Sequence, residues 1–205
     1  MARWFASTRR KAHTTVPIPQ LANDFAAAGQ QTDVRADLAF AQSVVETGFF
    51  SFPAGGQLLP RDNNFAGIGA CDTCAHGWSF PNALTGVTAQ MQLLDAYASS
   101  QRVPTNLVGD VGVGGCCPTW IELAGTWASS LQYGISIMTV YDQMLSWVIP
   151  QRLIAAGLLA PPKPAAARVA TVASQAKGAG TAAPASRVAP VLTAQPALAA
   201  QAVKP

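Results

Sequence analysis

Charged side chains are scarce in this chain of 205 residues, because Asp, Glu, Lys and Arg account for only 11% of it whereas hydrophobic residues account for 50%. This composition excludes a chain that is disordered throughout. A run of about 18 apolar residues, which a membrane-spanning helix requires, is missing as well. The longest candidate, residues 134–150, is interrupted by Asp142 and Gln143, which is typical of a buried helix. The length predicts one folded domain of about 150 residues plus an appendage.

Acidic residues are absent from residue 161 onward, although five basic residues lie there: Lys163, Arg168, Lys177, Arg187 and Lys204. The formal net charge of +3 therefore divides into +5 for this part and −2 for residues 1–160. Residues 159–205 are rich in Ala and Pro and have no aromatic side chain, which predicts a disordered, solvated tail. Loose association with an anionic polymer is the alternative. The body has no basic stripe interleaved with aromatics, which argues against nucleic-acid binding.

A signal peptide is also missing from the chain as it stands. Residues 1–13 carry basic side chains but no apolar core of about 7–15 residues behind them. We interpret residues 1–16 as an N-terminal extension. Either the protein is cytosolic, or it is exported by another route, or Met1 is not the natural start and the extension is truncated; we favour the last interpretation. The folded domain is predicted to occupy residues 17–158.

Hydrophobic positions at helical spacing indicate a mainly α fold with a small irregular or β lobe. In the first half of the chain, for example, Leu38, Ala41 and Val45 share one helix face. Segments that mix Gly, Pro, Asn and aromatics, residues 49–82 and 101–117, predict loops with at most short strands. The predicted helices span residues 17–30, 33–46, 84–99, 118–127 and 134–148, with a short piece at 151–157.

Glutamate is rare, since only Glu46 and Glu122 occur. Glu46 ends an apolar helical pattern and is followed at once by Thr47, Gly48 and aromatic residues. The partial negative charge of a helix C-terminus and an apolar setting both raise the pKa of a carboxyl group. A carboxylic acid that keeps its proton near neutral pH is what a glycosidase uses as general acid. The alternative is a solvated carboxylate at a helix end.

Four sequence motifs occur in a fixed order along the chain: AQSVVETGFFSF, DNNFAGIGA, FPNALTGVTAQMQLLDAYAS and LAGTWASSLQYGISI. In this order they resemble the bacterial glucosaminidase family, which comprises peptidoglycan-cleaving endo-β-N-acetylglucosaminidases of the lysozyme-like superfamily. The forms NNFAGIGA and LAGTWA…YG resemble an actinobacterial branch. The resemblance covers roughly residues 18–150. It implies an α+β lysozyme-like fold in which a helical bundle and a small lobe form a cleft for a glycan strand.

The resemblance also implies roles for individual residues. Glu46 matches the general acid, and Tyr133 matches a tyrosine that lines the sugar site opposite it. The remaining matches would form the floor and wall of the cleft: Asn64, Phe65, Gly67 and Trp127. Without the family, Trp127 and Tyr133 are interpreted as core residues, and the segment around Asn64 as an Asx turn.

A second carboxylate is harder to find, because the hairpin that carries it in many family members is shortened here to ACDTCAHGWSF. Asp72 is the first candidate and Asp62 the second. A water-activating base would lie about 6.5–9.5 Å from Glu46 and a nucleophile about 5–5.5 Å away. The N-acetyl group of the substrate is the remaining alternative.

Four cysteines occur on two loops: Cys71, Cys74, Cys116 and Cys117. An even number in an exported domain favours two disulfides over a zinc site or free thiols. We expect them to tie residues 71–76 to residues 115–118, with the pairing left open. His76 is either a substrate contact or a solvent-facing histidine.

Together these features predict a glycoside hydrolase, extracellular or bound to the cell wall, that acts as a monomer on peptidoglycan glycan strands. It would cleave β-1,4 bonds after N-acetylglucosamine without a metal or organic cofactor. The alternatives are a non-catalytic cell-wall glycan-binding module, a lytic transglycosylase on the same scaffold, and a zinc-stabilised interaction domain.

Overall fold

The structure, a computed structural model, describes residues 1–71, 73–101, 105–109, 112 and 114–162. Its elements are α1 (Ala2–Ser7), α2 (Ile18–Thr32), α3 (Ala36–Glu46), the 3-10 turn η1 (Pro60–Asp62), α4 (Ala83–Ala98) and α5 (Tyr133–Ala155). The described residues form no named strand, only an isolated bridge between Ala124 and Ala128. The prediction of a mainly helical fold is therefore confirmed, whereas the small lobe is irregular rather than β.

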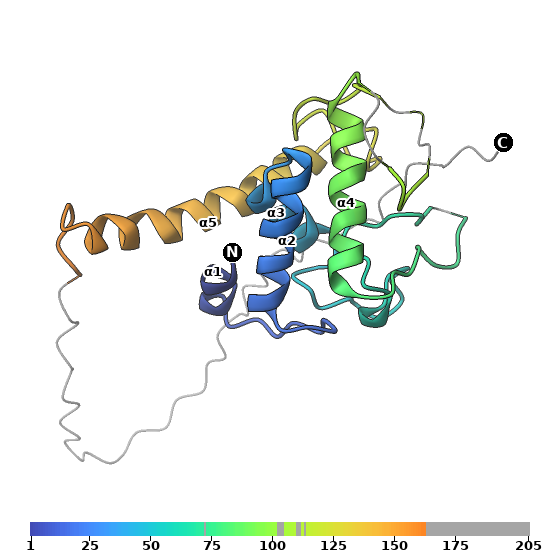
Figure 1. Ribbon diagram of the computed structural model, residues 1–205. Coiled ribbons are helices and arrows are strands. Elements are labelled where there is room, and N and C mark those ends of the chain that lie inside the picture. Colours follow the sequence, from blue (N-terminus) through green and yellow to red (C-terminus); the bar gives the residue numbers. More distant parts are fainter. Residues whose placement is uncertain (72, 102–104, 110–111, 113, 163–205) are drawn as a thin grey trace, which may run out of the picture.

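Helices α2 and α3 pack against each other and join the rest of the bundle. Helix α3 also contacts α5, and α2 also contacts α4 and α1. Figure 1 shows α5 running past this bundle and projecting beyond it. The rings of Phe25 on α2 and Phe40 on α3 meet edge to face at 5.5 Å, and neither is exposed to solvent. Removal of either ring is expected to cost about 3–5 kcal/mol, as is usual for a buried Phe replaced by Ala.

The first residues form a helix that the sequence did not predict. Trp4 and Phe5 of α1 are buried and contact Phe49 and Phe50, which follow α3, at ring distances of 6.4 and 5.5 Å. A helix of six residues is too short to be stable alone. Its stability therefore comes from these aromatic contacts, which a periodicity search within residues 1–16 does not detect.

Most predicted helices are present with shifted ends, but two predictions are wrong. Residues 118–127 form successive turns instead of a helix, and Gly125 there has a positive φ of 81° that an α-helix does not accommodate. Helix α5 continues through Pro150 and so includes the piece predicted separately at 151–157. Pro150 is exposed, where the loss of one backbone hydrogen bond is best tolerated.

The second half of α5 leaves the core, as the exposed side chains of Ile149 and Leu153 show. Despite this apolar character, no helix among the described residues is long and apolar enough to cross a membrane. The predicted tail begins just after this helix, and its residues from 163 onward lie outside the described residues.

The cysteines form two disulfides, Cys71–Cys74 and Cys116–Cys117. Two bridges were expected, and with both formed none of these cysteines is a free thiol. The expectation that they join the two loops is wrong, because each bridge closes within its own loop. The Cα atoms of Cys71 and Cys74 are 4.9 Å apart, within the usual range for a disulfide. Bridges this local constrain only a few residues of the unfolded chain.

Candidate active site

The chain reverses direction immediately after Glu46, the last residue of α3. Gly48, Phe49, Phe50 and Phe52 all adopt left-handed backbone conformations, with φ between 48° and 61°. For a residue with a side chain this conformation costs about 1–2 kcal/mol. Burial of Phe50 and Phe52 in the core offsets that cost, and the Thr47 hydroxyl accepts the N–H of Phe50 at 2.9 Å. The reversal holds the end of α3, and hence Glu46, in a defined position.

Glu46 is partly exposed as a residue, yet its carboxyl group is crowded by protein atoms. The hydroxyl of Tyr133, at the start of α5, donates a hydrogen bond to Glu46 Oε1. Burial raises the pKa of Glu46 to about 7, while the Tyr133 hydroxyl and, secondarily, the Trp127 indole N–H act in the opposite direction. The Trp127 N–H makes its hydrogen bond to the Ala66 carbonyl, at 3.1 Å. Glu46 therefore keeps its proton up to neutral pH.

Behind Tyr133 lies a chain of buried amide side chains whose direction is set by the backbone. Gln90 Nε2 donates to the carbonyl of Ala39 at 3.1 Å, and a carbonyl can only accept. The same nitrogen donates to Gln42 Oε1 at 2.8 Å, which leaves Gln42 Nε2 to donate to the Tyr133 hydroxyl at 2.9 Å. Because Tyr133 accepts that bond, its own hydrogen is available for Glu46.

This direction decides which oxygen of Glu46 carries the proton. Tyr133 donates to Oε1, and in a carboxylic acid the carbonyl oxygen is the better acceptor. The acidic hydrogen therefore belongs on Oε2. Tyr133 itself stays neutral, since burial first and the charge of Glu46 second raise its pKa well above the ordinary value.

The turn at residues 64–68 lies beside this group and is built by Asn64. Asn64 Oδ1 accepts the N–H groups of Ala66 and Ile68 at 3.3 and 3.1 Å. Its Nδ2 donates to the carbonyls of Ile68 and Trp78 at 2.8 and 2.9 Å. Asn64 is completely buried, so all its hydrogen-bonding capacity serves to shape the turn.

The neighbours of Asn64 in the turn are buried as well. Phe65 has no exposed surface and packs edge to face on Phe50 and Phe52 at 6.3 and 6.5 Å. Gly67 is buried and has a positive φ of 69°. Trp127 is only 4% exposed, and its ring also contacts Tyr97 at 5.1 Å. The structure thus buries all four predicted substrate-binding residues, and Trp127 is the one that links the turn to the carboxyl group of Glu46.

The candidates for a second carboxylate are not equivalent. Asp62 is 7% exposed, and its two oxygens accept the N–H of Leu59 at 2.8 Å and the hydroxyl of Ser79 at 2.9 Å. These bonds hold η1 together. Asp72 lies outside the described residues. Within the described part of the chain, no second acid contributes to the raised pKa of Glu46.

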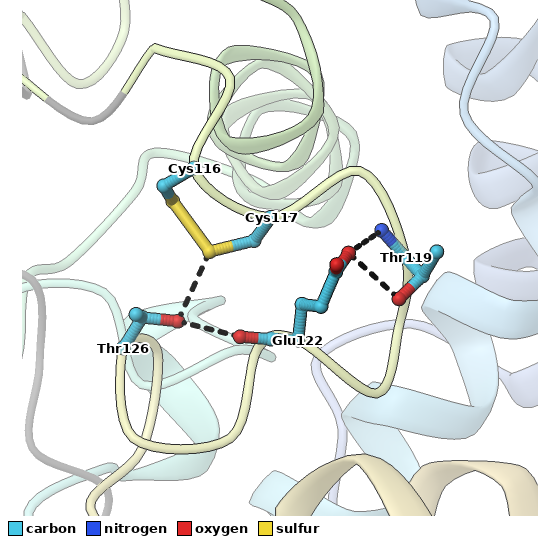
Figure 2. Close-up of a disulfide and its surroundings, with 5 residues drawn as sticks. All are labelled: Cys116, Cys117, Thr119, Glu122 and Thr126. Atoms are coloured by element: carbon cyan, nitrogen blue, oxygen red, sulfur yellow. Dashed lines mark hydrogen bonds between the residues drawn. A yellow bond between two sulfur atoms is a disulfide. The ribbon is translucent and has the colours of Figure 1, made fainter.

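Glu122, the other glutamate, has a local role in the second loop. Its Oε2 accepts the N–H and the hydroxyl of Thr119, both at 2.8 Å (Figure 2). In the same loop the Cys117 sulfur contacts the Thr126 hydroxyl at 3.2 Å. Cys117 also donates its backbone N–H to the Tyr97 carbonyl at 2.9 Å, which anchors the loop beside Trp127. His76, in the first loop, is exposed.

Sequence reasoning missed Gln42 and Gln90, the two fully buried amides of the hydrogen-bond chain. A signal for Gln42 was present. It precedes Glu46 by four residues, so the two share a helix face, and it is polar in an otherwise apolar stretch. The signal for Gln90 is weaker, because its partner Gln42 lies 48 residues earlier on another helix.

Comparison with known proteins identifies the family of the chain. A family model for glucosaminidase, described as mannosyl-glycoprotein endo-beta-N-acetylglucosaminidase, matches residues 22–146. The chain belongs to the glucosaminidase family. The matched region of this glucosaminidase-family chain contains Glu46, Tyr133 and the buried amides that connect to them.

One relative of this glucosaminidase-family chain is an uncharacterized protein of Borreliella burgdorferi, 33% identical over 117 residues. The matched part is 56% of this chain and 56% of that protein, so the chain spans little more than half the length of that relative. No solved structure matches the chain.

Proposed function

We propose that this protein is a glycoside hydrolase that cleaves the β-1,4 bond after N-acetylglucosamine in peptidoglycan, with Glu46 as general acid. Membership of the glucosaminidase family supplies the glycosidase class. The observation that carries the proposal is the state of Glu46, whose pKa is about 7 and whose Oε1 is engaged by Tyr133. A solvated helix-end carboxylate would show neither property.

In the proposed reaction, Glu46 Oε2 donates its proton to the glycosidic oxygen as the bond to the anomeric carbon breaks. An oxocarbenium-like state develops on the sugar, and Glu46 becomes a carboxylate. The hydrogen bond from Tyr133 then acquires a charged acceptor and strengthens, because bonds to ionised groups are about twice as strong as neutral ones. Tyr133 therefore stabilises the transition state more than the ground state.

The group that stabilises the anomeric carbon is proposed to be the N-acetyl group of the substrate. Its carbonyl oxygen would attack the anomeric carbon to form a cyclic intermediate, which water would open with the Glu46 carboxylate as base. Support comes from the described residues, where Asp62 is committed to η1 and no second acid perturbs Glu46. Asp72 stays a candidate for a nucleophile or base.

The other family positions are proposed to act beneath the bound glycan. Asn64, Phe65 and Gly67 would fix the floor of the binding site rather than touch sugar, since their burial leaves them little contact surface. Trp127 would brace the same floor through its hydrogen bond to Ala66. The proposed site of action is the cell wall, because that is where the glycan occurs.

A lytic transglycosylase is the second candidate, and the same observation favours it. A transglycosylase needs one acid. Among the described residues, Glu46 is the acid whose buried carboxyl group accepts the hydrogen bond from Tyr133. A hydroxyl of the substrate, rather than water, would then close on the anomeric carbon. Mass spectrometry separates the two activities, since hydrolysis adds water to the product whereas transglycosylation leaves an anhydro sugar.

The decisive experiment compares muropeptide release from purified peptidoglycan by the wild type and by Glu46→Gln. Loss of a general acid is expected to reduce the rate by about 10²–10⁴-fold. Glu122→Gln is the matched control, because it makes the same change at the only other glutamate and should leave the rate unaltered. Equal rates for wild type and Glu46→Gln would overturn the proposal. Tight binding to cell wall with no new reducing ends would instead indicate a glycan-binding module.

A further inference from the structure

Trp78 is the one aromatic side chain among the large hydrophobic residues that are exposed in the described part of the chain. It is 39% exposed, whereas Trp4 and Trp127 are each 4% exposed. A single exposed apolar residue is common on protein surfaces and does not by itself indicate a site. What distinguishes Trp78 is the way in which the protein holds it.

Both backbone groups of Trp78 are tied to the turn at residues 64–68. Its N–H donates to the Ile68 carbonyl at 2.8 Å, and its carbonyl accepts from Asn64 at 2.9 Å. The five-membered part of its ring rests on Gly69, where a Cβ would lie 2.0 Å from Trp78 Cδ1. Only glycine permits this close approach, so the ring is seated on Gly69, directly after the turn, while part of the side chain stays exposed.

The same turn connects Trp78 to Glu46. The Ala66 carbonyl accepts the Trp127 N–H, and that indole influences the carboxyl group of Glu46. Gly69 follows Ala66 by three positions, a span of at most about 10 Å even if fully extended. The same short segment therefore holds Trp78 and also bonds to Trp127, the indole that acts on Glu46.

We propose that Trp78 is a stacking platform for a pyranose ring of the bound glycan and so forms a sugar subsite on the segment that also bonds to Trp127, the neighbour of Glu46. The proposal rests on the proposed function, which it deepens. The C–H groups of a pyranose face pack on an aromatic ring, and a Trp ring offers the largest area for this contact.

Trp78 is expected to contribute to binding rather than to chemistry. In Trp78→Ala, KM for a soluble oligomer of β-1,4-linked N-acetylglucosamine should rise about tenfold, with kcat changed less than about threefold. Trp78→Phe, which retains a ring, should stay within about threefold of wild type in KM. Gly69→Ala should resemble Trp78→Ala although it keeps the indole, because the new Cβ displaces the ring from its seat. Leu158→Ala, an exposed apolar site beyond α5, is the matched control.

Binding is measured separately from activity by calorimetry with the same oligomer, with every variant placed in a Glu46→Gln background and checked for folding by circular dichroism. An affinity loss of about tenfold for Trp78→Ala that Trp78→Phe largely restores supports the platform. Unchanged affinity in folded Trp78→Ala, or an equal loss in Trp78→Phe, overturns it. Failure of the proposed function would appear differently, as full activity of Glu46→Gln, and would leave this binding comparison intact.

Discussion

The two ends of α3 each carry a carboxylic acid, and the protein treats them in opposite ways. For Asp37, in the first turn, burial acts to raise the pKa, but hydrogen bonds and the charge of Arg35 and the N–H of Leu38 outweigh it, and the pKa is lowered. Arg35 donates to both oxygens of Asp37, at 3.0 and 2.7 Å. For Glu46, in the last turn, burial is again the largest single influence on the pKa. Here the opposing hydrogen bonds do not outweigh it, and the pKa is raised to about 7.

This comparison shows that a neighbouring cation, and not the degree of burial alone, determines whether each of these acids is ionised. Among the groups that act on Glu46 only neutral donors occur, Tyr133 and Trp127. Hydrogen bonds from neutral donors offset part of the cost of desolvating a carboxylate, whereas the electrostatic attraction of a nearby cation can exceed that cost. The helix dipole acts in the same direction, since it favours an anion at the first turn and disfavours one at the last.

The largest expected effect is on the pH dependence of kcat/KM, which reports ionisations of the free enzyme. Because Glu46 must be protonated and its pKa is about 7, activity should fall tenfold per pH unit above 7. At pH 9 this is a loss of about 100-fold. A rate profile on a soluble oligomer measures it. If a second carboxylate such as Asp72 acted as nucleophile, an additional loss would appear on the acid side, where that carboxylate becomes protonated; substrate assistance predicts none.

The next effect is a gain of stability in Glu46→Gln. The folded-state pKa of Glu46 lies above its unfolded value, so the wild type loses stability as pH rises from about 4.5 to 7. Replacement by a neutral amide removes this loss. At pH 8 we expect Glu46→Gln to exceed wild type by about 1–3 kcal/mol in the free energy of unfolding, and the two to be equal at pH 4. Urea unfolding at both pH values measures the difference, and a gain that is the same at both would contradict an electrostatic origin.

A smaller effect tests the hydrogen-bond chain. The Tyr133 hydroxyl lowers the pKa of Glu46, so Tyr133→Phe should move the basic limb of the rate profile upward by about one pH unit. Gln42→Met should move it in the same direction by less, because Gln42 lowers the pKa of Tyr133 and so makes its hydroxyl a stronger donor. Glu122→Gln serves as control. If the basic limb of the pH profile were unchanged in both variants, the hydrogen bonds of Tyr133, Gln42 and Gln90 would contribute only to packing.

The smallest effect belongs to the other end of α3. Asp37→Asn should leave activity unaltered and lower the free energy of unfolding at pH 7 by about 0.5 kcal/mol, since the pair with Arg35 is substantially exposed. The pKa of Asp37 is lowered by folding, so this contribution is present above its unfolded value and disappears as pH falls through the folded one. Unfolding at pH 7 and pH 2 measures it. A difference that persists at pH 2 would assign it to helix packing instead.

Four of the helices were predictable because their apolar residues recur at helical spacing. This spacing located α2, α3 and α4 within about three residues and the start of α5 within one, but it placed the end of α5 seven residues too early. The predicted rise in the pKa of Glu46 agrees with the structure. The helix predicted at 118–127 failed for the opposite reason. Trp127 in this segment contacts Tyr97 of α4 and the Ala66 carbonyl of the turn at 64–68, and Cys117, just before the segment, bonds to the Tyr97 carbonyl. These long-range contacts outweigh local preference.

That Glu46 ends an apolar helical pattern follows from the sequence, and this pattern indicated the direction in which its pKa moves. The burial that raises the pKa, and the groups that surround the carboxyl, come from the tertiary structure. Tyr133 comes from 87 residues away, and Gln90, two bonds behind it, comes from yet another helix. A hydrogen bond depends on distances of a few tenths of an ångström, and no local pattern encodes distances between elements so far apart in the chain.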